Sequence, residues 1–386
     1  MLVQYKTYVD TPLISGPRNK INSFYANMRP YLDALPLLLY RSRLSPPWSL
    51  AWLPYNINFE ATSTEPDLIH LHGVGHGFLS LADIRKLSGP LVWTLHDSWA
   101  FTGGCHLPGS CELYRESCGW CPQLNARHEQ DLSRWGWNRK SNCWPTLDIT
   151  FVAPSNWLAR SAQSSSLLRS MHVEVIPNGI DTLRFSPADR AGARAALGLP
   201  QDGLFLLYGA ASFMRDENKG FTLFIEALKL ISANVARNSL TIVLFGDSHC
   251  QETEIAGIPV RSYGVISEDD KLVSLYRAAD FFVLPSQQEN LPYTVMESMA
   301  CGTPCVAFDV GGIGDLISHG VSGYFAEAGN IQELAEGIMW MLNDGSRREQ
   351  LGRQSRLTIE HGFSQDTVVE RYVALYEKIL DNRKNR

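Results

Sequence analysis

Residues 285–305, PSQQENLPYTVMESMACGTPC, place two glutamates, Glu289 and Glu297, around a predicted helix start. Pro292 suits the first helical turn, because a proline there gives up an N–H that has no partner in the helix. Gly302 suits the position just after the last turn. The pattern predicts a helix of about ten residues, with Glu289 in the loop before it and Glu297 one to two turns inside.

Such a helix start is suited to a phosphate group, because its first amides are unpaired and carry the positive end of the helix dipole. Carboxylates only accept hydrogen bonds and suit pairs of hydroxyls. Together these groups match a sugar nucleotide, with one acid on the sugar, the other on the ribose and the amides on the diphosphate. The alternative is that Glu289 is a solvated loop residue and Glu297 a surface residue. The spacing alone leaves the two interpretations at even odds, and the buried apolar runs on either side favour the first.

Around this stretch, short apolar runs alternate with longer helical segments such as 222–232 and 269–279. This alternation predicts an α/β fold with parallel sheets and crossover helices. Ligands bind at the carboxyl ends of such strands, so polar residues directly after a strand are candidates for a site. The predicted strands lie within residues 67–73, 89–97, 148–155, 173–179, 204–210, 239–247, 261–266, 280–286 and 303–309.

A chain of 386 residues is long enough for about two domains. The loop-like SSSLLRS and the chain break at IPNGID place the boundary within residues 165–182. We predict a first domain at 1–170, a second domain at 171–363, and a C-terminal helical segment at 364–386 that crosses back to the first domain. Two α/β domains of similar size are expected to face each other across a cleft.

The composition is that of an ordinary globular protein, with 45% hydrophobic and 19% charged residues. A formal charge of −6 argues against nucleic acid as the main partner. The sequence holds no apolar run of membrane-spanning length and no secretory signal at its first residues. These features predict a cytoplasmic protein, with peripheral contact at the inner face of the plasma membrane left open.

The segment ENLPYTVMESMACGTPCVAFDVGGIGDLI, with VIPNGID upstream and GVSGYF downstream, resembles family 4 of the retaining glycosyltransferases (glycosyl transferases group 1). The stretch TLHDSWAFTGGCH…CGWCPQL is similar to a bacterial polysaccharide-building branch of that family. The resemblance implies the GT-B architecture, in which two Rossmann-like domains face a central cleft, with the acceptor side in the first domain and the donor nucleotide in the second. It also implies transfer of a hexose from a nucleoside-diphosphate sugar, such as UDP-glucose, to a polysaccharide or lipid-linked glycan.

The resemblance assigns roles to residues around the helix start. Glu289 matches the acid beside the donor sugar, and Glu297 matches the acid that binds the ribose. The amides of Asn290 and Leu291 match those that hold the diphosphate.

Further residues match the family pattern in other loops. Lys219, in a KG pair, matches one of two basic residues that neutralise the diphosphate. The usual Arg after Gly209 is absent, and Arg215 is a candidate replacement. His96 ends a predicted strand and resembles the family histidine near the donor sugar, although it also fits a structural histidine. The backbone of Ile266 matches a position that meets the nucleotide base.

Stabilisation of the departing diphosphate by positive charge is the chemistry that the resemblance implies. The sequence holds no Asp-x-Asp motif, which fits a metal-independent transfer with no cofactor required for catalysis. Two other function classes stay open on the same fold. One is a sugar-nucleotide epimerase or sugar phosphorylase, and the other is a donor-binding pseudoenzyme.

Four cysteines, Cys105, Cys111, Cys118 and Cys121, lie within one glycine-containing loop. The C-x2-C end has the spacing of a zinc knuckle, and the C-x5-C end is looser, with His106 as a substitute ligand. The cluster therefore predicts either a structural zinc or reduced cysteines packed as small apolar residues.

The N-terminal part departs from the family pattern. The usual first strand, glycine-rich loop and helix are not found, and MLVQYK resembles the second strand of the family. Residues 29–53 combine leucine, tryptophan and arginine, which fits either core packing or a face for a lipid-linked acceptor at a membrane.

Overall fold

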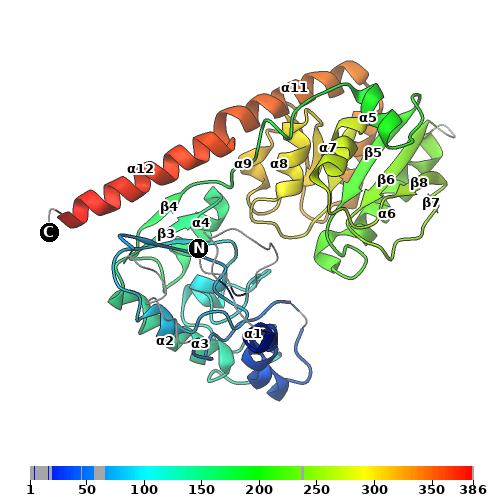
Figure 1. Cartoon of the computed structure of the whole chain (residues 1–386). Coiled ribbons are helices and arrows are strands. Elements are labelled where there is room, and N and C mark those ends of the chain that lie inside the picture. The colour runs from blue at the N-terminus through cyan, green and yellow to red at the C-terminus, as the bar shows by residue number, and fades with distance from the viewer. Residues whose placement is uncertain are drawn as a thin grey trace. The chain divides into compact units, whose positions relative to one another are not determined.

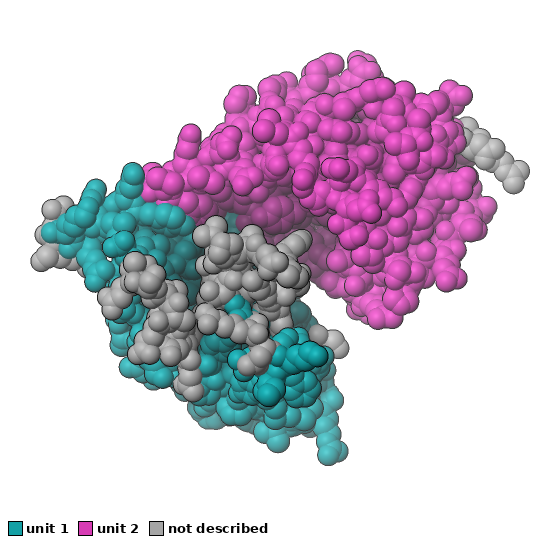
Figure 2. Space-filling view, viewed as in Figure 1, with its two compact units in different colours: residues 1–175, 375–386 teal, residues 176–374 magenta. Residues whose placement is uncertain are grey.

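The computed structural model describes residues 4, 16, 20–44, 46–55, 66–235 and 239–384. It divides into two compact units, unit 1 with residues 1–175 and 375–386 and unit 2 with residues 176–374 (Figures 1 and 2). The first division lies a few residues beyond the boundary predicted at residue 170. The chain returns from unit 2 to unit 1 after Ala374, which lies inside the last helix, α12 (Gln365–Lys384). The MLVQYK segment, apart from Gln4, falls outside the described residues.

Unit 1 contains a parallel sheet of four strands in the order β1-β2-β3-β4. Its core includes the fully buried Trp144 and Phe151. The strands are β1 (Ile69–His72), β2 (Leu91–Thr94), β3 (Ile149–Ala153) and β4 (Val173–Val175). The helices are α1 (Lys20–Asp33), α2 (Leu81–Ile84), α3 (Leu132–Ser141) and α4 (Asn156–Ser164), with 3-10 turns at Leu35–Leu39, Trp99–Phe101, Leu113–Arg115 and Trp144–Thr146.

Unit 2 contains a seven-stranded sheet in the order β11-β10-β9-β5-β6-β8-β7. Every pairing in it is parallel except that of β7 with β8. The strands are β5 (Leu204–Gly209), β6 (Leu240–Phe245), β7 (Glu254–Ile255), β8 (Ile258–Ser262), β9 (Phe281–Leu284), β10 (Cys305–Phe308) and β11 (Gly323–Ala326). The helices are α5 (Arg190–Ala196), α6 (Phe221–Ile231), α7 (Asp269–Ala278), α8 (Tyr293–Ala300), α9 (Ile313–Leu316), α10 (Ile331–Leu342), α11 (Gly345–Gly362) and α12 (Gln365–Lys384).

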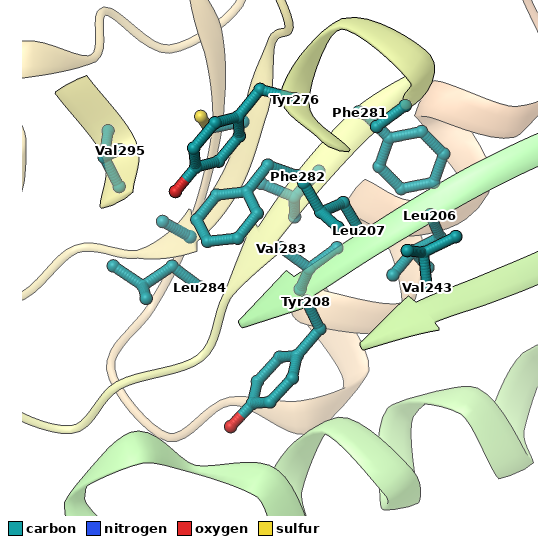
Figure 3. Packing of buried hydrophobic residues seen from close by; sticks show 14 of the residues in the cluster. Leu206, Leu207, Tyr208, Val243, Tyr276, Phe281, Phe282, Val283, Leu284 and Val295 are labelled. Carbon is teal, nitrogen blue, oxygen red and sulfur yellow. The ribbon is translucent and has the colours of Figure 1, made fainter. Parts of the chain in front are cut away.

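The central strands of unit 2 are apolar on both faces. Leu206, Leu207, Phe281 and Phe282 are fully buried, and Figure 3 shows their side chains packed with Val283 and their neighbours. Strands of this kind occur where helices cover both faces of a parallel sheet. This is why the sequence reads as continuous apolar runs in this region rather than as alternation.

Eight of the nine predicted strands enclose an observed one. The prediction at 261–266 is wrong in its bounds, because β8 spans Ile258–Ser262. Its first residues pair with β7 in an antiparallel hairpin. Strand β7 was not predicted because it is two residues long, and β11 because it begins at Gly323 and is only partly buried.

The order of the strands in unit 2 reverses direction at one place. From β5 the chain proceeds through β6 and β8 to one edge, and then from β9 through β10 and β11 to the other. Strands β5 and β9 are neighbours, with Leu206 opposite Phe281. Such a reversal opens a crevice at the carboxyl ends of the two strands, where ligands bind in α/β sheets.

The last helix, α12, begins after Ser364, whose Oγ accepts the amide of Thr367. Its second half, from Leu375, belongs to unit 1, where Tyr376 Oη lies 2.6 Å from His70 Nδ1 and Lys378 Nζ lies 3.2 Å from Glu174 Oε1. Within the described residues, every helix is too short or too polar to span a bilayer.

Candidate active site

Helix α8 starts one residue after the predicted position and has eight residues where about ten were predicted. Pro292 is its N-cap residue, one position before the predicted first turn, and has no side-chain oxygen to accept the first amides. Gly302 follows the helix with a φ of 76°, the left-handed conformation that a C-terminal glycine supplies. The amides of Tyr293 and Thr294 belong to the first turn and lack a carbonyl four residues back within the helix. The start of α8 is therefore able to bind an anion.

Lys219 and Glu289 form an ion pair beside this helix start. Lys219 Nζ lies 2.8 Å from Glu289 Oε1, and their side chains are 23% and 14% exposed. Lys219 lies in the loop after β5 and Glu289 in the loop after β9. The pair is therefore at the reversal point of the sheet, where a ligand is expected.

Backbone contacts hold these two loops together. The amide of Gln287 donates to the carbonyl of Asn218 at 2.8 Å, and Asn218 Nδ2 donates to the carbonyl of Gln288 at 2.9 Å. Gly220 has a φ of +68°, and a Cβ there would lie 1.9 Å from the carbonyl oxygen of Pro285. The KG pair is thus explained by packing, because only glycine lets the loop after β5 approach the end of β9 so closely.

A second loop supports Glu289 from the other side. Gly311, in the VGG segment after β10, has a φ of +61°, and a Cβ there would lie 1.6 Å from the carbonyl oxygen of Glu289. Asn178, in the IPNGID segment, donates from Nδ2 to the carbonyl of Leu291 at 3.3 Å. The IPNGID and VGG segments, both part of the family resemblance, therefore meet around residues 289–291.

Glu297 lies one turn inside α8, as predicted. Tyr276, on α7, donates its hydroxyl to Glu297 Oε2 at 2.8 Å. Burial raises the pKa of Glu297 from its usual 4.5 to about 7, although the hydrogen bond from Tyr276 opposes the shift. This carboxylate is held in place to accept hydrogen bonds from hydroxyl groups.

Arg215 points to a different partner. Its Nη2 lies 2.9 Å from His249 Nε2, and His249 Nδ1 lies 3.1 Å from Asp247 Oδ1. The carboxylate of Asp247 also accepts the amide of Met214 at 3.1 Å, which fixes the loop after β5. Lys219 therefore pairs with Glu289, whereas Arg215 contacts His249 in the loop after β6. The contact of Arg215 with the diphosphate stays a prediction.

The remaining donor-side residues lie in strand ends and loops of unit 2. Gly209 ends β5, and a Cβ there would lie 2.1 Å from the Phe245 ring of the neighbouring strand. Ile266 follows β8 and packs partly against the core. Leu291 is buried in the loop before α8. The nucleotide and diphosphate contacts of Asn290, Leu291 and Ile266 stay predictions.

His96 belongs to a group of histidines at the carboxyl ends of β1 and β2 in unit 1. Its Nε2 lies 2.9 Å from His72 Nδ1, and His70 Nε2 lies 2.8 Å from Thr94 Oγ1. Loss of hydration lowers the pKa of His96, opposed by the charge of Asp97, and burial lowers the pKa of His70 to about 3. These imidazoles are therefore neutral near pH 7.

Sequence reasoning missed a hydrogen-bonded chain next to His96. Asp97 Oδ2 lies 2.7 Å from His106 Nδ1, and His106 Nε2 lies 2.8 Å from Ser49 Oγ. Burial raises the pKa of Asp97, but its hydrogen bonds with His106 and the amide of Trp99 outweigh this and lower it. These residues, with His76 and His96, lie at or beside a cavity of about 50 Å³. The three residues are 57 and 9 positions apart in the chain, which gives no sequence signal.

Cys105, Cys111, Cys118 and Cys121 line one cavity of about 20 Å³ as free thiols. In the part of the chain that the structure describes, no three His, Cys, Asp or Glu side chains are placed to hold a metal ion. His106 is bonded through both ring nitrogens elsewhere, and the zinc site stays a prediction.

Comparisons with known proteins match both units. The model of "Glycosyl transferases group 1" matches residues 193–358, and that of "Glycosyltransferase Family 4" matches residues 15–184. The chain belongs to glycosyltransferase family 4. Among the curated relatives of this family 4 chain is D-inositol 3-phosphate glycosyltransferase 1 of Catenulispora acidiphila, 28% identical over 83% of the chain and 74% of that protein. The chain spans about half, 49%, of a D-inositol 3-phosphate glycosyltransferase from Acidothermus cellulolyticus, with 30% identity.

Solved structures show that the family 4 chain has the GT-B fold, with one Rossmann-like sheet in each unit. A sucrose-phosphate synthase from Thermosynechococcus elongatus matches with a TM-score of 0.66 and 20% identity, over 96% of this chain and 82% of that one. Anabaena HepE in complex with UDP matches with a TM-score of 0.61 and 20% identity, over 82% and 80%. Other solved complexes of HepE hold UDP with glucose, or UDP-glucose.

Proposed function

We propose that the chain transfers a hexose, with retention of configuration, from a UDP-hexose such as UDP-glucose to a polysaccharide or lipid-linked glycan of the cell envelope. The observation that carries the proposal is the Lys219–Glu289 ion pair, 2.8 Å long, at the reversal point of the unit 2 sheet and beside the start of α8. The complexes of HepE support UDP as the nucleotide. The eight free thiols favour a reducing compartment, so we place the protein in the cytoplasm.

In this proposal the positive groups of unit 2 hold the leaving group. The amides of α8 and the Lys219 ammonium receive the diphosphate, and Glu297 accepts hydrogen bonds from the ribose hydroxyls. Because Glu289 is paired with Lys219, it holds the ammonium in position while its second oxygen is able to accept a sugar hydroxyl. These groups supply the charge stabilisation that the transfer needs without a catalytic metal.

The proposed reaction exchanges one bond at the anomeric carbon. The bond from this carbon to the β-phosphate oxygen breaks, and its electron pair leaves with UDP. The acceptor hydroxyl oxygen bonds to the anomeric carbon on the same face, and its proton goes to the departing phosphate oxygen. Lys219 and the helix amides stabilise the negative charge that develops on that oxygen.

Incubation of the full chain with UDP-glucose tests the proposal, with and without a membrane or glycan fraction as acceptor. We expect UDP release and a glycosylated product only when acceptor is present, with the donor's anomeric configuration in the proton NMR spectrum of the product. Conversion of the donor alone would favour an epimerase, and phosphate-dependent cleavage a phosphorylase. Tight donor binding without turnover would favour a pseudoenzyme.

A further inference from the structure

Helix α1 buries charged residues and exposes apolar ones. Its buried residues are Ala26, Arg29 and Asp33, two of which are charged. The opposite face is apolar and exposed, with Phe24 68% and Tyr31 71% accessible. The exposed apolar residues of α1 are Ile21, Phe24, Tyr25, Met28 and Tyr31, which recur at helical spacing and form one stripe.

Polar contacts hold the helix by its charged face. Arg29 donates from Nη1 to the carbonyl of Pro54 at 2.9 Å and from Nη2 to that of Leu53 at 2.8 Å. Asp33 Oδ2 accepts the amide of Leu50 at 3.0 Å, and its Oδ1 accepts that of Trp52 at 3.3 Å. The orientation of α1 is therefore fixed by buried hydrogen bonds, and these leave its apolar stripe exposed on the surface of unit 1.

The stripe continues into the segment that follows the helix. Leu35, Leu38, Leu39 and Leu44 are exposed, with Leu39 81% accessible. Together with the stripe on α1 they form what we call the apolar face of residues 20–44. An exposed face of this extent marks an interaction site, because soluble surfaces seldom gather so many large apolar side chains.

The exposed charges within residues 20–44 have one sign. The exposed charged residues within 20–44 are Lys20, Arg41 and Arg43, and the one acidic residue of this range, Asp33, is buried. The chain as a whole carries a formal charge of −6. Exposed basic residues at both ends of an apolar segment, in a chain of negative net charge, match the chemistry of an anionic lipid surface.

We propose that the apolar face of residues 20–44 docks on a membrane that contains anionic lipids. The apolar stripe enters the boundary between headgroups and acyl chains, and the three basic side chains lie at the level of the lipid phosphates. This inference stands independently of the proposed transfer, since it rests on unit 1 alone.

Flotation of the full chain with vesicles tests the proposal. We expect binding to vesicles of phosphatidylcholine mixed with phosphatidylglycerol, several-fold weaker binding to phosphatidylcholine alone, and weaker binding at high salt. The absence of binding to either kind of vesicle would overturn the proposal. Self-association in solution without vesicle binding would instead assign the face to a second copy of the chain. Vesicle binding by a protein that binds no UDP-glucose would support membrane docking and contradict the proposed function.

Paired variants separate the two contributions. Phe24→Ser combined with Leu39→Ser is expected to weaken partitioning by about tenfold or more, because each removes a large apolar side chain from the lipid contact. Arg41→Gln combined with Arg43→Gln is expected to abolish the preference for anionic vesicles. Leu183→Ser is the matched control, since Leu183 is 90% exposed in unit 2, and should bind as the wild type does. Unchanged binding of both double variants would contradict the proposal, with circular dichroism verifying that each is folded.

Discussion

Lys219 Nζ and Glu289 Oε1 lie 2.8 Å apart, although 70 residues separate them in the chain. Strands β5 and β9 are neighbours in the sheet, so the loops that follow them meet. The sequence suggested both residues as donor ligands but gave no sign that they contact each other. The ion pair joins the two loops, and its loss is expected to affect the reaction more than donor binding.

Substitution of Lys219 by Met should lower kcat by about 10²–10³-fold, because it removes positive charge from where the diphosphate leaves. The donor KM should change less, since the amides of α8 still bind the phosphates. Glu289→Gln, which keeps the shape but removes the charge that positions Lys219, should lower kcat by a smaller factor. Steady-state kinetics check this, and equal changes in kcat and 1/KM would argue against the role of Lys219 in the leaving-group step.

The raised pKa of Glu297 predicts a pH-dependent stability. Its folded pKa of about 7 exceeds the usual 4.5, so between these values the folded state holds the proton more tightly. The free energy of unfolding should therefore fall as the pH rises from 4.5 to 7. Glu297→Gln should remove this slope and be more stable than the wild type at pH 8, by about 1–2 kcal/mol.

Urea unfolding at pH 4.5 and pH 8 checks the prediction for Glu297. Parallel pH profiles for the wild type and Glu297→Gln would show that this carboxyl does not titrate as inferred. A Glu333→Gln variant is a suitable control, because Glu333 is a carboxylate on another helix of unit 2, α10.

Removal of the Tyr276 hydroxyl should shift the pH dependence of donor binding. Tyr276 donates to Glu297 Oε2 and so opposes the rise in the pKa of Glu297. We expect donor affinity to increase as Glu297 ionises, and Tyr276→Phe to move the midpoint of that increase to higher pH. Calorimetric titration of UDP-glucose across pH 6 to 9 checks this. An unshifted midpoint would mean that the hydrogen bond does not tune Glu297.

Gly311 is expected to be essential for the shape of the site. Gly311→Ala places a Cβ 1.6 Å from the carbonyl of Glu289, so the loop must move in addition to the strain of a positive φ. Gly329→Ala is the matched control, since Gly329 has a φ of +76° and open space around its Cβ. We expect Gly329→Ala to cost about 1 kcal/mol and to keep donor affinity, and Gly311→Ala to lose donor binding at least tenfold. Similar donor affinities for the two variants would contradict this account of the loop.

The zinc prediction is tested by the metal content of the purified chain. A structural zinc predicts one zinc per chain, lost with Cys118→Ser and retained with Cys143→Ser, because Cys143 is a buried cysteine outside the four that line the cavity. Packed thiols predict a purified chain without zinc. Zinc would draw the four sulfurs together as thiolates and offset the burial that raises the pKa of Cys118 to about 12. A metal-free wild type would leave the cluster as packed thiols.

Sequence patterns predicted much of the fold and part of the site for local reasons. Pro292 and Gly302 define α8 by their own backbone preferences, and buried strands such as β9 appear as apolar runs. The hydrogen-bonded chain of Asp97, His106 and Ser49 could not be predicted, because its members meet only in the folded unit. The exposure of the apolar stripe of α1 could not be predicted either. The sequence shows the helical period of the apolar residues but not whether their side of the helix is buried or exposed.

The most direct test of the donor site is calorimetric titration of the full chain with UDP-glucose, UDP-GlcNAc, GDP-mannose and ADP-glucose, repeated on Glu297→Ala. The account predicts selective binding of a UDP-sugar to the wild type and at least tenfold weaker binding to the variant, since the ribose contact is lost. Wild-type binding that survives unchanged in Glu297→Ala, or no binding of any donor, would contradict the assignment of the site in unit 2.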